Sequence, residues 1–298
     1  MEIRSVQEFL NIIEMLKNNY TYTRDKIHSK IMPPRTFVPK FIFRGHSSLE
    51  YKLLPSIFRE ASVNCSITTT KYSQLEFNIL SDFISEANRF TKEISSDNYI
   101  AWLEIAQHFG VPTRLLDFTE NPLVALYFAC ESLSSNDAAV CILNVPSYNK
   151  KFYDYNTYFV LNNLSKQNVN SIVNSEIVCQ DFQTPHYNNP YFLQFPWVYK
   201  PCYIEERMTL QSSIFMLWAA RQNDLESFMD KSNFLLFDKN VENKEEGILG
   251  KVIIPNNIKK HIIEQLNLLG VNEKSIYPGL DGIGKYIRTK YSFDSPYV

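Results

Sequence analysis

Four side chains that could carry chemistry lie within one apolar segment, residues 101–129. The segment reads AWLEIAQHFGVPTRLLDFTENPLVALYFA, and these side chains are His108, Arg114, Asp117 and Thr119. Buried hydrogen-bonding and ionisable groups need a partner, because burial without one costs free energy. We therefore expect them to pair with each other or with a ligand, and the segment to line the functional site.

Each of these side chains also has a structural explanation. His108 could be a hydrogen-bonded core residue, and Arg114 and Asp117, three positions apart, could pair with each other. Thr119 could cap the helix that follows it. The residue types leave both explanations open. The functional hypothesis therefore depends on the clustering of the four side chains.

A second candidate is Arg44-Gly45, at the end of the apolar run FIF at 41–43. A guanidinium at a strand end suits bidentate binding of a phosphate or carboxylate, and glycine lets another group approach closely. Arg59 could provide a second anion contact. The alternative for Arg44 is an ion pair with a core acid such as Asp117, and for Arg59 a surface or network position.

The third candidate is the segment EERMTLQSSIFML, residues 205–217. Its pattern predicts a strand over 208–217, which would place Arg207, Thr209 and Gln211 on one face. The alternative is a polar sheet face in solvent.

Hydrophobic periodicity predicts interspersed helices and strands around these residues. Ser5 caps a first helix that ends near Asn18, and Asn121 or Thr119 caps a buried helix that begins at Pro122. Because the elements do not alternate strictly, an α+β fold with a mixed sheet core and flanking helices is favoured. Further helices are expected at 73–90, 99–109 and 257–269, strands at 41–43, 138–145, 208–217 and 248–254, and a mixed tail at 277–291.

The chain divides into an N-terminal helix with a lead-in, residues 1–40, and a main domain, residues 40–290, with a long insertion at about 147–200. Glycine is scarce, at 8 of 298 residues, and neither GxGxxG nor GxxxxGK[ST] occurs, so the common nucleotide-binding loops are absent. The net charge of -2 does not by itself indicate a polyanionic partner, although a local basic groove is compatible with it.

The composition also predicts the cellular compartment. The five cysteines are scattered without a CxxC pair, which is typical of reduced thiols in an intracellular protein. The N-terminus is amphipathic and acidic, and no apolar run approaches the ~20 residues of a membrane span. We therefore expect a cytoplasmic protein that contacts no membrane, and we expect no metal.

Four segments resemble, in order, the landmarks of the FRG-domain family, which is named after its arginine-glycine motif. They are FRGHSSLEYKLLPSIFR, QHFGVPTRLLDFTENPLVALYFA, ERMTLQSSIF and IPNNIKKHIIEQLNLLGVNEKSIYPGLDGIGKYI. The resemblance covers roughly residues 40–287, and its second motif is highly specific. Two departures concern substrate detail: Ser213 stands where the family usually has glycine, and His46 where glutamine is common.

A weaker resemblance is to ADP-ribosyltransferases of the arginine-serine-glutamate type, through FIFRG, DFTENPLVALYFA and RMTLQ. It implies an ADP-ribosyltransferase-like fold and NAD as co-substrate. Arg44-Gly45, Arg114 and Arg207 would bind the dinucleotide, and Thr119 would shape the nicotinamide pocket. Gln211 would take the position of the catalytic glutamate but cannot act as a general base. Asp117 or Glu206 would then supply the carboxylate, and His108 would orient one of these groups.

The resemblances lead to an NAD-dependent ADP-ribosyltransferase as the first hypothesis, a bacterial toxin or phage-defence effector. Its acceptor would be a nucleic acid or protein, and an antitoxin or chaperone would be its partner. The alternatives are a non-catalytic module that binds a nucleotide or partner, and a nucleotide hydrolase with His108 and Asp117 as acid-base pair.

Overall fold

The computed structural model describes residues 1–19, 41–61, 69–91, 94–95, 98–132, 134–153, 195–201, 205–218, 223–235, 237 and 247–291. The predicted lead-in at 20–40 and most of the insertion, 154–194, lie outside these ranges. The helices are α1 (Val6–Asn19), α2 (Ser56–Ala61), α3 (Thr69–Ala87), α4 (Tyr99–His108), α5 (Pro122–Cys130), α6 (Val145–Tyr153), α9 (Glu206–Leu210), α10 (Lys259–Leu268), α11 (Glu273–Ile276) and α12 (Gly279–Lys290). The strands are β1 (Phe41–His46), β2 (Leu115–Thr119), β3 (Ala138–Asn144), β4 (Trp197–Tyr199), β5 (Ser213–Leu217) and β6 (Leu249–Ile254), and three short 3-10 helices are η2 (Leu225–Phe228), η3 (Lys231–Asn233) and η4 (Asn256–Ile258).

The six strands form one sheet in the order β4-β5-β2-β1-β3-β6, with every neighbouring pair antiparallel. This confirms the predicted α+β class. β1 and β3 pair along their length, with Arg44 opposite Cys141. On the other side of β3, Cys141 lies opposite Lys251 of β6. By contrast, β1 and β2 share only the pair Phe43 and Thr119. The sheet therefore opens between β1 and β2.

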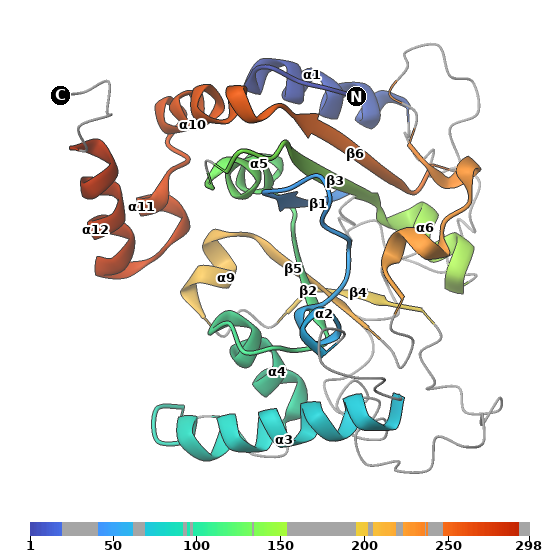
Figure 1. Ribbon diagram of the computed structural model, residues 1–298, viewed down its shortest axis with the longest axis vertical. Helices are drawn as coiled ribbons and strands as arrows, with labels where there is room; N and C mark the ends of the chain where they lie inside the picture. The colour runs from blue at the N-terminus through green and yellow to red at the C-terminus, as the bar shows by residue number, and fades with distance from the viewer. Residues whose placement is uncertain are drawn as a thin grey trace, which may run out of the picture.

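Two groups of helices cover the same face of the sheet, one on each side of this opening. α1, α5 and α10 pack on β1, β3 and β6, whereas α3 and α4 pack on β2, β4 and β5. Figure 1 shows the first group in its upper part and the second in its lower part. The opposite face packs mainly against α2, α6 and η2.

The predicted start and burial of helix α5 are confirmed. Asn121 Oδ1 accepts a hydrogen bond from Leu123 N at 3.0 Å, and Pro122 occupies the first helical turn. Asn121 is therefore the cap. Thr119 Oγ1 supports this turn by accepting from Asn121 N at 2.9 Å. The helix is apolar on all sides because β1 and β3 cover one side and α10 another.

The predicted strand over 208–217 is wrong in its first half. Glu206–Leu210 forms helix α9, Ser212 has a positive φ of 49°, and the strand begins at Ser213. Over so few residues, alternating apolar and polar residues fit a single helical turn as well as a strand. Arg207, Thr209 and Gln211 therefore do not share one strand face.

The C-terminal segment contains a helix where the sequence pattern indicated mixed structure. α12 covers Gly279–Lys290 and follows the short α11 after Pro278. The predicted helix before it appears as η4 and α10, and Gly270 follows its end with a positive φ of 82°. No helix in the described ranges is both long and apolar enough to cross a membrane.

Candidate functional site

A cavity of about 350 Å³ lies where β1 and β2 part, between α5 on one side and α4 on the other. Strand positions from β1, β2 and β5 form its floor, and α9 contributes to its wall. The structure brings together here seven of the predicted site residues, whereas Arg114 and Glu206 do not line this cavity. The seven residues are Arg44, Gly45, His108, Asp117, Thr119, Arg207 and Gln211.

Arg44 contacts Asp117 and still reaches the cavity. Its Nη1 donates to the backbone oxygen of Asp117 at 2.6 Å and lies 3.7 Å from Asp117 Oδ2. Burial lowers the pKa of Arg44 and the carboxylate of Asp117 opposes this, so the guanidinium remains a cation. Because 20% of its side chain is exposed and it lines the cavity, Arg44 can contact Asp117 and an anionic ligand together.

Asp117 is held by a residue that the sequence analysis did not single out, Gln107. Gln107 Nε2 donates to Asp117 Oδ2 at 2.5 Å, and Gln107 Oε1 accepts from Thr113 Oγ1 at 2.6 Å. The threonine thus orients the amide so that its NH₂ group faces the carboxylate. Asp117 remains 46% exposed to the cavity. Gln107 directly precedes His108 in the specific motif QHFGVPTR, which was the available signal.

His108 is a half-buried histidine at the end of α4. Its pKa is lowered by burial and by the charge of Arg207, against the opposing charges of Glu205 and Asp117. The imidazole is therefore neutral at neutral pH and can accept a proton. It packs edge-on against Phe109, with ring centroids 4.9 Å apart.

Thr119 and Gln211 join the end of β2 to the turn before β5. Thr119 Oγ1 donates to the backbone oxygen of Gln211 at 2.6 Å, and Gln211 Nε2 donates to Ile276 O at 3.3 Å. These bonds hold Gln211 at the cavity wall, next to the left-handed residue Ser212. Within the described part of the chain no hydrogen bond uses Gln211 Oε1, which leaves an acceptor for a ligand hydroxyl.

Arg114 lies outside the lining of this cavity, and it pairs with Glu76 rather than with Asp117, the alternative that the sequence had left open. Its Nε is 2.6 Å from Glu76 Oε2 on α3, with both side chains buried, and its backbone N donates to Glu76 Oε1 at 3.1 Å. Arg114 precedes β2, which begins at Leu115, and its side chain turns toward Glu76 on α3. Asp117 lies within β2 and faces the cavity.

Gly45 is required for the close packing of α5 on β1. A Cβ at this position would clash with the backbone oxygen of Ala125 and lie 2.6 Å from Ala129 N. The group that approaches Gly45 closely is thus the backbone of α5. This contact fixes the distance between Arg44 and the helix that borders the cavity.

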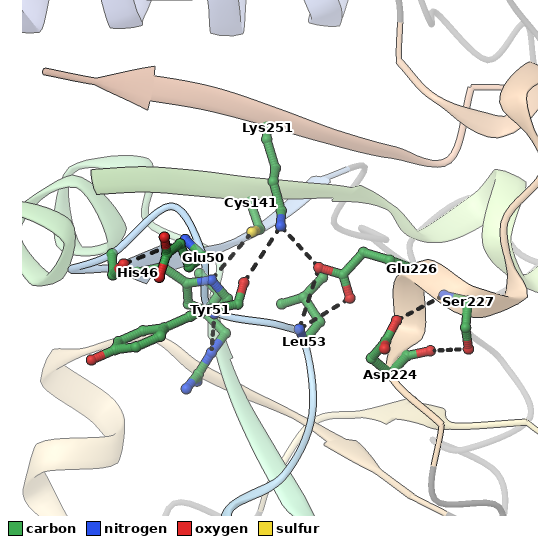
Figure 2. Close-up of polar contacts among 11 residues, drawn as sticks. His46, Glu50, Tyr51, Leu53, Cys141, Asp224, Glu226, Ser227 and Lys251 are labelled. Atoms are coloured by element: carbon green, nitrogen blue, oxygen red, sulfur yellow. Dashed lines mark hydrogen bonds and ion pairs between the residues drawn. The ribbon is translucent and has the colours of Figure 1, made fainter. Parts of the chain in front are cut away.

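His46 is a second partner of the Arg44 guanidinium. His46 Nε2 accepts a hydrogen bond from Arg44 Nε at 3.2 Å, and Cys141 Sγ lies 3.8 Å from His46 Nδ1. Figure 2 shows His46 and Cys141 beside a network around Lys251. Lys251 Nζ lies 2.9 Å from Glu226 Oε1 and 3.5 Å from Tyr51 O. Glu226 Oε2 accepts from Leu53 N at 3.0 Å. The loop after β1 is therefore tied to β6 and η2.

The neutral state of His46 makes stability depend on pH. Burial, followed by the charges of Arg44, Lys251 and Arg59, lowers the pKa of His46 from 6.5 to about 3. Between these values the unfolded chain binds a proton that the folded chain does not, so the stability contributed here falls as the pH falls. The expected slope is about 1.4 kcal/mol per pH unit.

His46→Gln should remove this slope, because a glutamine oxygen can still accept from Arg44. We expect the difference in unfolding free energy between wild type and His46→Gln to change by about 1.4 kcal/mol per unit between about pH 6 and about pH 4. Urea unfolding at several pH values measures it. The matched control is His261→Gln, at a side chain that is 56% exposed on α10. Parallel curves for wild type and His46→Gln would contradict the prediction.

The cysteines within the described ranges are buried and free. Burial raises the thiol pKa of both Cys130 and Cys141 to about 12, so neither is a nucleophile at neutral pH. Cys65, Cys179 and Cys202 lie outside the described residues. Among the described residues no cluster of three or more histidine, cysteine, aspartate or glutamate side chains could hold a metal ion.

Comparison with known proteins relates part of the chain to one family. Residues 39–138 match the family model described as FRG domain, which confirms the predicted resemblance to that family. The matched span contains Arg44, His108, Asp117 and Thr119, whereas Gln211 lies beyond it. No curated protein and no solved structure matches the chain.

Proposed function

We propose that this protein is an NAD-dependent ADP-ribosyltransferase. The observation that carries the proposal is the convergence of Arg44, Asp117, Thr119 and Gln211 on one cavity. They come from β1, from β2 and from the turn before β5, in the order that the resemblance to arginine-serine-glutamate transferases implies. Catalytic groups must reach one reacting centre, and a shared cavity satisfies this requirement.

The reaction is the transfer of ADP-ribose from nicotinamide to an acceptor. The bond between nicotinamide nitrogen and the anomeric carbon breaks, and its electron pair leaves with nicotinamide. A lone pair of the acceptor forms the new bond to that carbon, and the acceptor proton passes to a base. The anomeric carbon is oxocarbenium-like in the transition state, as in glycoside hydrolysis, so a nearby carboxylate stabilises it.

The cavity residues suit separate parts of this reaction. Arg44 binds the pyrophosphate, and Asp117, half-exposed and held by Gln107, provides the carboxylate beside the reacting ribose. Gln211 contributes a hydrogen bond through its amide oxygen but cannot take a proton. His108, neutral and half-buried, accepts the acceptor proton. Glu206 is not among the residues that line the cavity, so Asp117 is the better placed carboxylate.

The size of the cavity matches part of the dinucleotide. Cavities for small ligands span about 300–1,000 Å³, and about 350 Å³ is at the lower end of that range. The nicotinamide and its ribose occupy this space, and the pyrophosphate extends past Arg44. A cytoplasmic role as a toxin or phage-defence effector, held in check by an antitoxin or chaperone, rests on the family resemblance alone.

Release of nicotinamide from NAD tests the proposal. Arg44→Ala should lower the rate by about 100-fold or more, because removing a preorganised charge from a reacting site costs about that much. Asp117→Asn should have an effect of the same order, and Gln211→Ala a strong one. The control is Arg4→Ala, at a side chain that is 73% exposed on the N-terminal segment. The proposal fails if purified protein neither binds nor consumes NAD.

The second candidate is a nucleotide-binding module without catalysis. It is favoured by Gln211, which stands where the transferases carry the catalytic glutamate. Such a protein would bind NAD or a related nucleotide in a manner that depends on Arg44, and no nicotinamide would be released. Isothermal calorimetry and product analysis on the same samples separate the two candidates.

A further inference from the structure

A second cavity adjoins the first at α12. It has a volume of about 570 Å³ and shares His108 and Arg207 with the first cavity, so the two are neighbours. Its other walls come from Phe109, from the turn after α11 and from α12. Figure 1 shows α11 and α12 beside α9, with α4 beneath it. Apart from His108, the residues that line the second cavity have no part in the proposed reaction at Asp117.

The second cavity is lined by an excess of positive charge. Arg207, Lys285 and Arg288 line it, against the single carboxylate of Asp281. Within the described part of the chain, none of the three cations forms an ion pair with a carboxylate. The protein as a whole has a net charge of -2, so this concentration of cations is local. Such a site favours an anionic ligand.

Two of these cations are preorganised by one aromatic ring. Arg207 Cζ lies 4.7 Å and Lys285 Nζ 4.2 Å from the ring centroid of Tyr277. The tyrosine is itself held, because its hydroxyl donates to Glu131 Oε1 at 2.7 Å. The ring therefore holds each of the two charges at the cavity wall, where no carboxylate of the described residues pairs with them. Cations held in this way suit the oxygens of a phosphate.

An exposed aromatic ring lies in the same lining. Phe109 is 63% exposed, although phenylalanine is among the residue types most often buried. The ring of His108 packs against it nearly at a right angle. An exposed aromatic ring beside several cations suits single-stranded nucleic acid, with a base on the ring and the phosphates on the cations.

The cations divide between the two cavities. Arg44 and Arg59 line the first cavity and not the second, Lys285 and Arg288 line the second and not the first, and Arg207 lines both. Arg44 and Arg59 suit the pyrophosphate of the dinucleotide. Lys285 and Arg288 are left for another anion.

We propose that the second cavity binds the acceptor and that the acceptor is a single-stranded nucleic acid. A phosphate lies against Arg207, Lys285 and Arg288, and a neighbouring base stacks on Phe109. The acceptor atom then faces His108, which borders both cavities. The role as acceptor rests on the proposed transferase function, whereas the binding of a strand does not.

Binding of a labelled oligonucleotide tests the site without any catalysis. Fluorescence anisotropy is measured with mixed-sequence DNA and RNA strands of about ten nucleotides, a length that covers one site, over a range of salt concentrations. Lys285→Glu with Arg288→Glu should weaken binding at least about tenfold and reduce the salt slope by about 0.7 for each phosphate that the variant no longer neutralises. Phe109→Ala should weaken it between about 5-fold and about 100-fold with little change in slope.

Lys290→Glu is the matched control, because it reverses a charge on α12 outside the lining of the cavity. Its effect should be clearly smaller than that of the double variant, since Lys290 does not line the cavity and its reversal removes no contact with the phosphates. Circular dichroism confirms that each variant is folded. Equal binding by wild type and the Lys285→Glu, Arg288→Glu variant would overturn the proposal, as would competition by a mononucleotide as effective as that of the strand.

The fate of labelled ADP-ribose separates this inference from the proposed function. The protein is incubated with labelled NAD, single-stranded nucleic acid and total cell protein. If nuclease releases the label from the product, the acceptor site is supported. If protease alone releases it, the acceptor site is overturned. If the strand binds through Lys285 and Arg288 but NAD is not consumed, the binding site stands and the transferase proposal fails. If NAD is consumed but no strand binds, the transferase proposal stands and the nucleic-acid site fails.

Discussion

Gly45→Ala is expected to lower the free energy of unfolding by about 3 kcal/mol, at the upper end for an overpacked position. A methyl group there would meet the backbone of α5 at Ala125 and Ala129, and backbone atoms cannot rotate away as a side chain would. The helix must shift from β1, or the strand must bend. Either change also moves the wall of the cavity relative to Arg44, so ligand binding should weaken as well.

Gly284→Ala is the matched control for this prediction. Gly284 lies within α12, and a Cβ there would meet no atom within 4 Å. Alanine should therefore stabilise the helix by about 0.5–1 kcal/mol. Urea unfolding followed by circular dichroism measures both variants. A stability of Gly45→Ala equal to wild type would mean that α5 does not pack on Gly45 as described.

Arg114→Met is expected to destabilise the protein by about 3–5 kcal/mol, because it leaves the buried carboxylate of Glu76 without its cation. Arg114 Nε lies 2.6 Å from Glu76 Oε2, and the side chains of Arg114 and Glu76 are 6% and 2% exposed. Glu76→Leu should have an effect of the same order. The double variant should recover much of the loss, since two apolar groups of similar volume leave no buried charge.

Lys200→Met provides the control for the buried pair. Lys200 lies 3.4 Å from Glu120, and its side chain is 40% exposed, so its loss should cost at most about 1 kcal/mol. The four stabilities of the Arg114 and Glu76 cycle, from urea unfolding, give the coupling energy directly. Additive effects of the two single variants would show that the pair contributes no coupling.

Local residues predicted much of the secondary structure. The Asn121-Pro122 start of α5 and the apolar periodicity of α1 and α10 depend on hydrogen bonds and packing within a few residues. The class α+β followed from the irregular alternation of such elements. The segment 208–212 was mispredicted because its alternation is too short to distinguish a helical turn from a strand, and only the packing of Met208 and the turn at Ser212 decide between them.

The sequence pointed to residues that line one cavity more successfully than it pointed to their hydrogen-bond and ion-pair partners. Arg44, Asp117 and Gln211 were identified from residue type and position, and they line one cavity. The contact between Arg44 and Asp117 had been named as an alternative. Gln107 and Glu76 were not identified as partners, because Gln107 reaches Asp117 from the preceding helix and Glu76 reaches Arg114 from a helix 38 positions earlier. His46, adjacent to the Arg-Gly motif, was noted only as a departure from the family pattern.

The sequence alone determined the elements, the presence of an arginine at a strand end and the cluster of polar residues in an apolar segment, because these depend on neighbours along the chain. The tertiary structure alone decided which of those residues meet. The single pair between β1 and β2 opens the sheet, the contact of α5 with Gly45 sets one wall, and α12 adds a basic cavity beside it. Contacts between residues distant in sequence depend on the packing of whole elements, which no local pattern encodes.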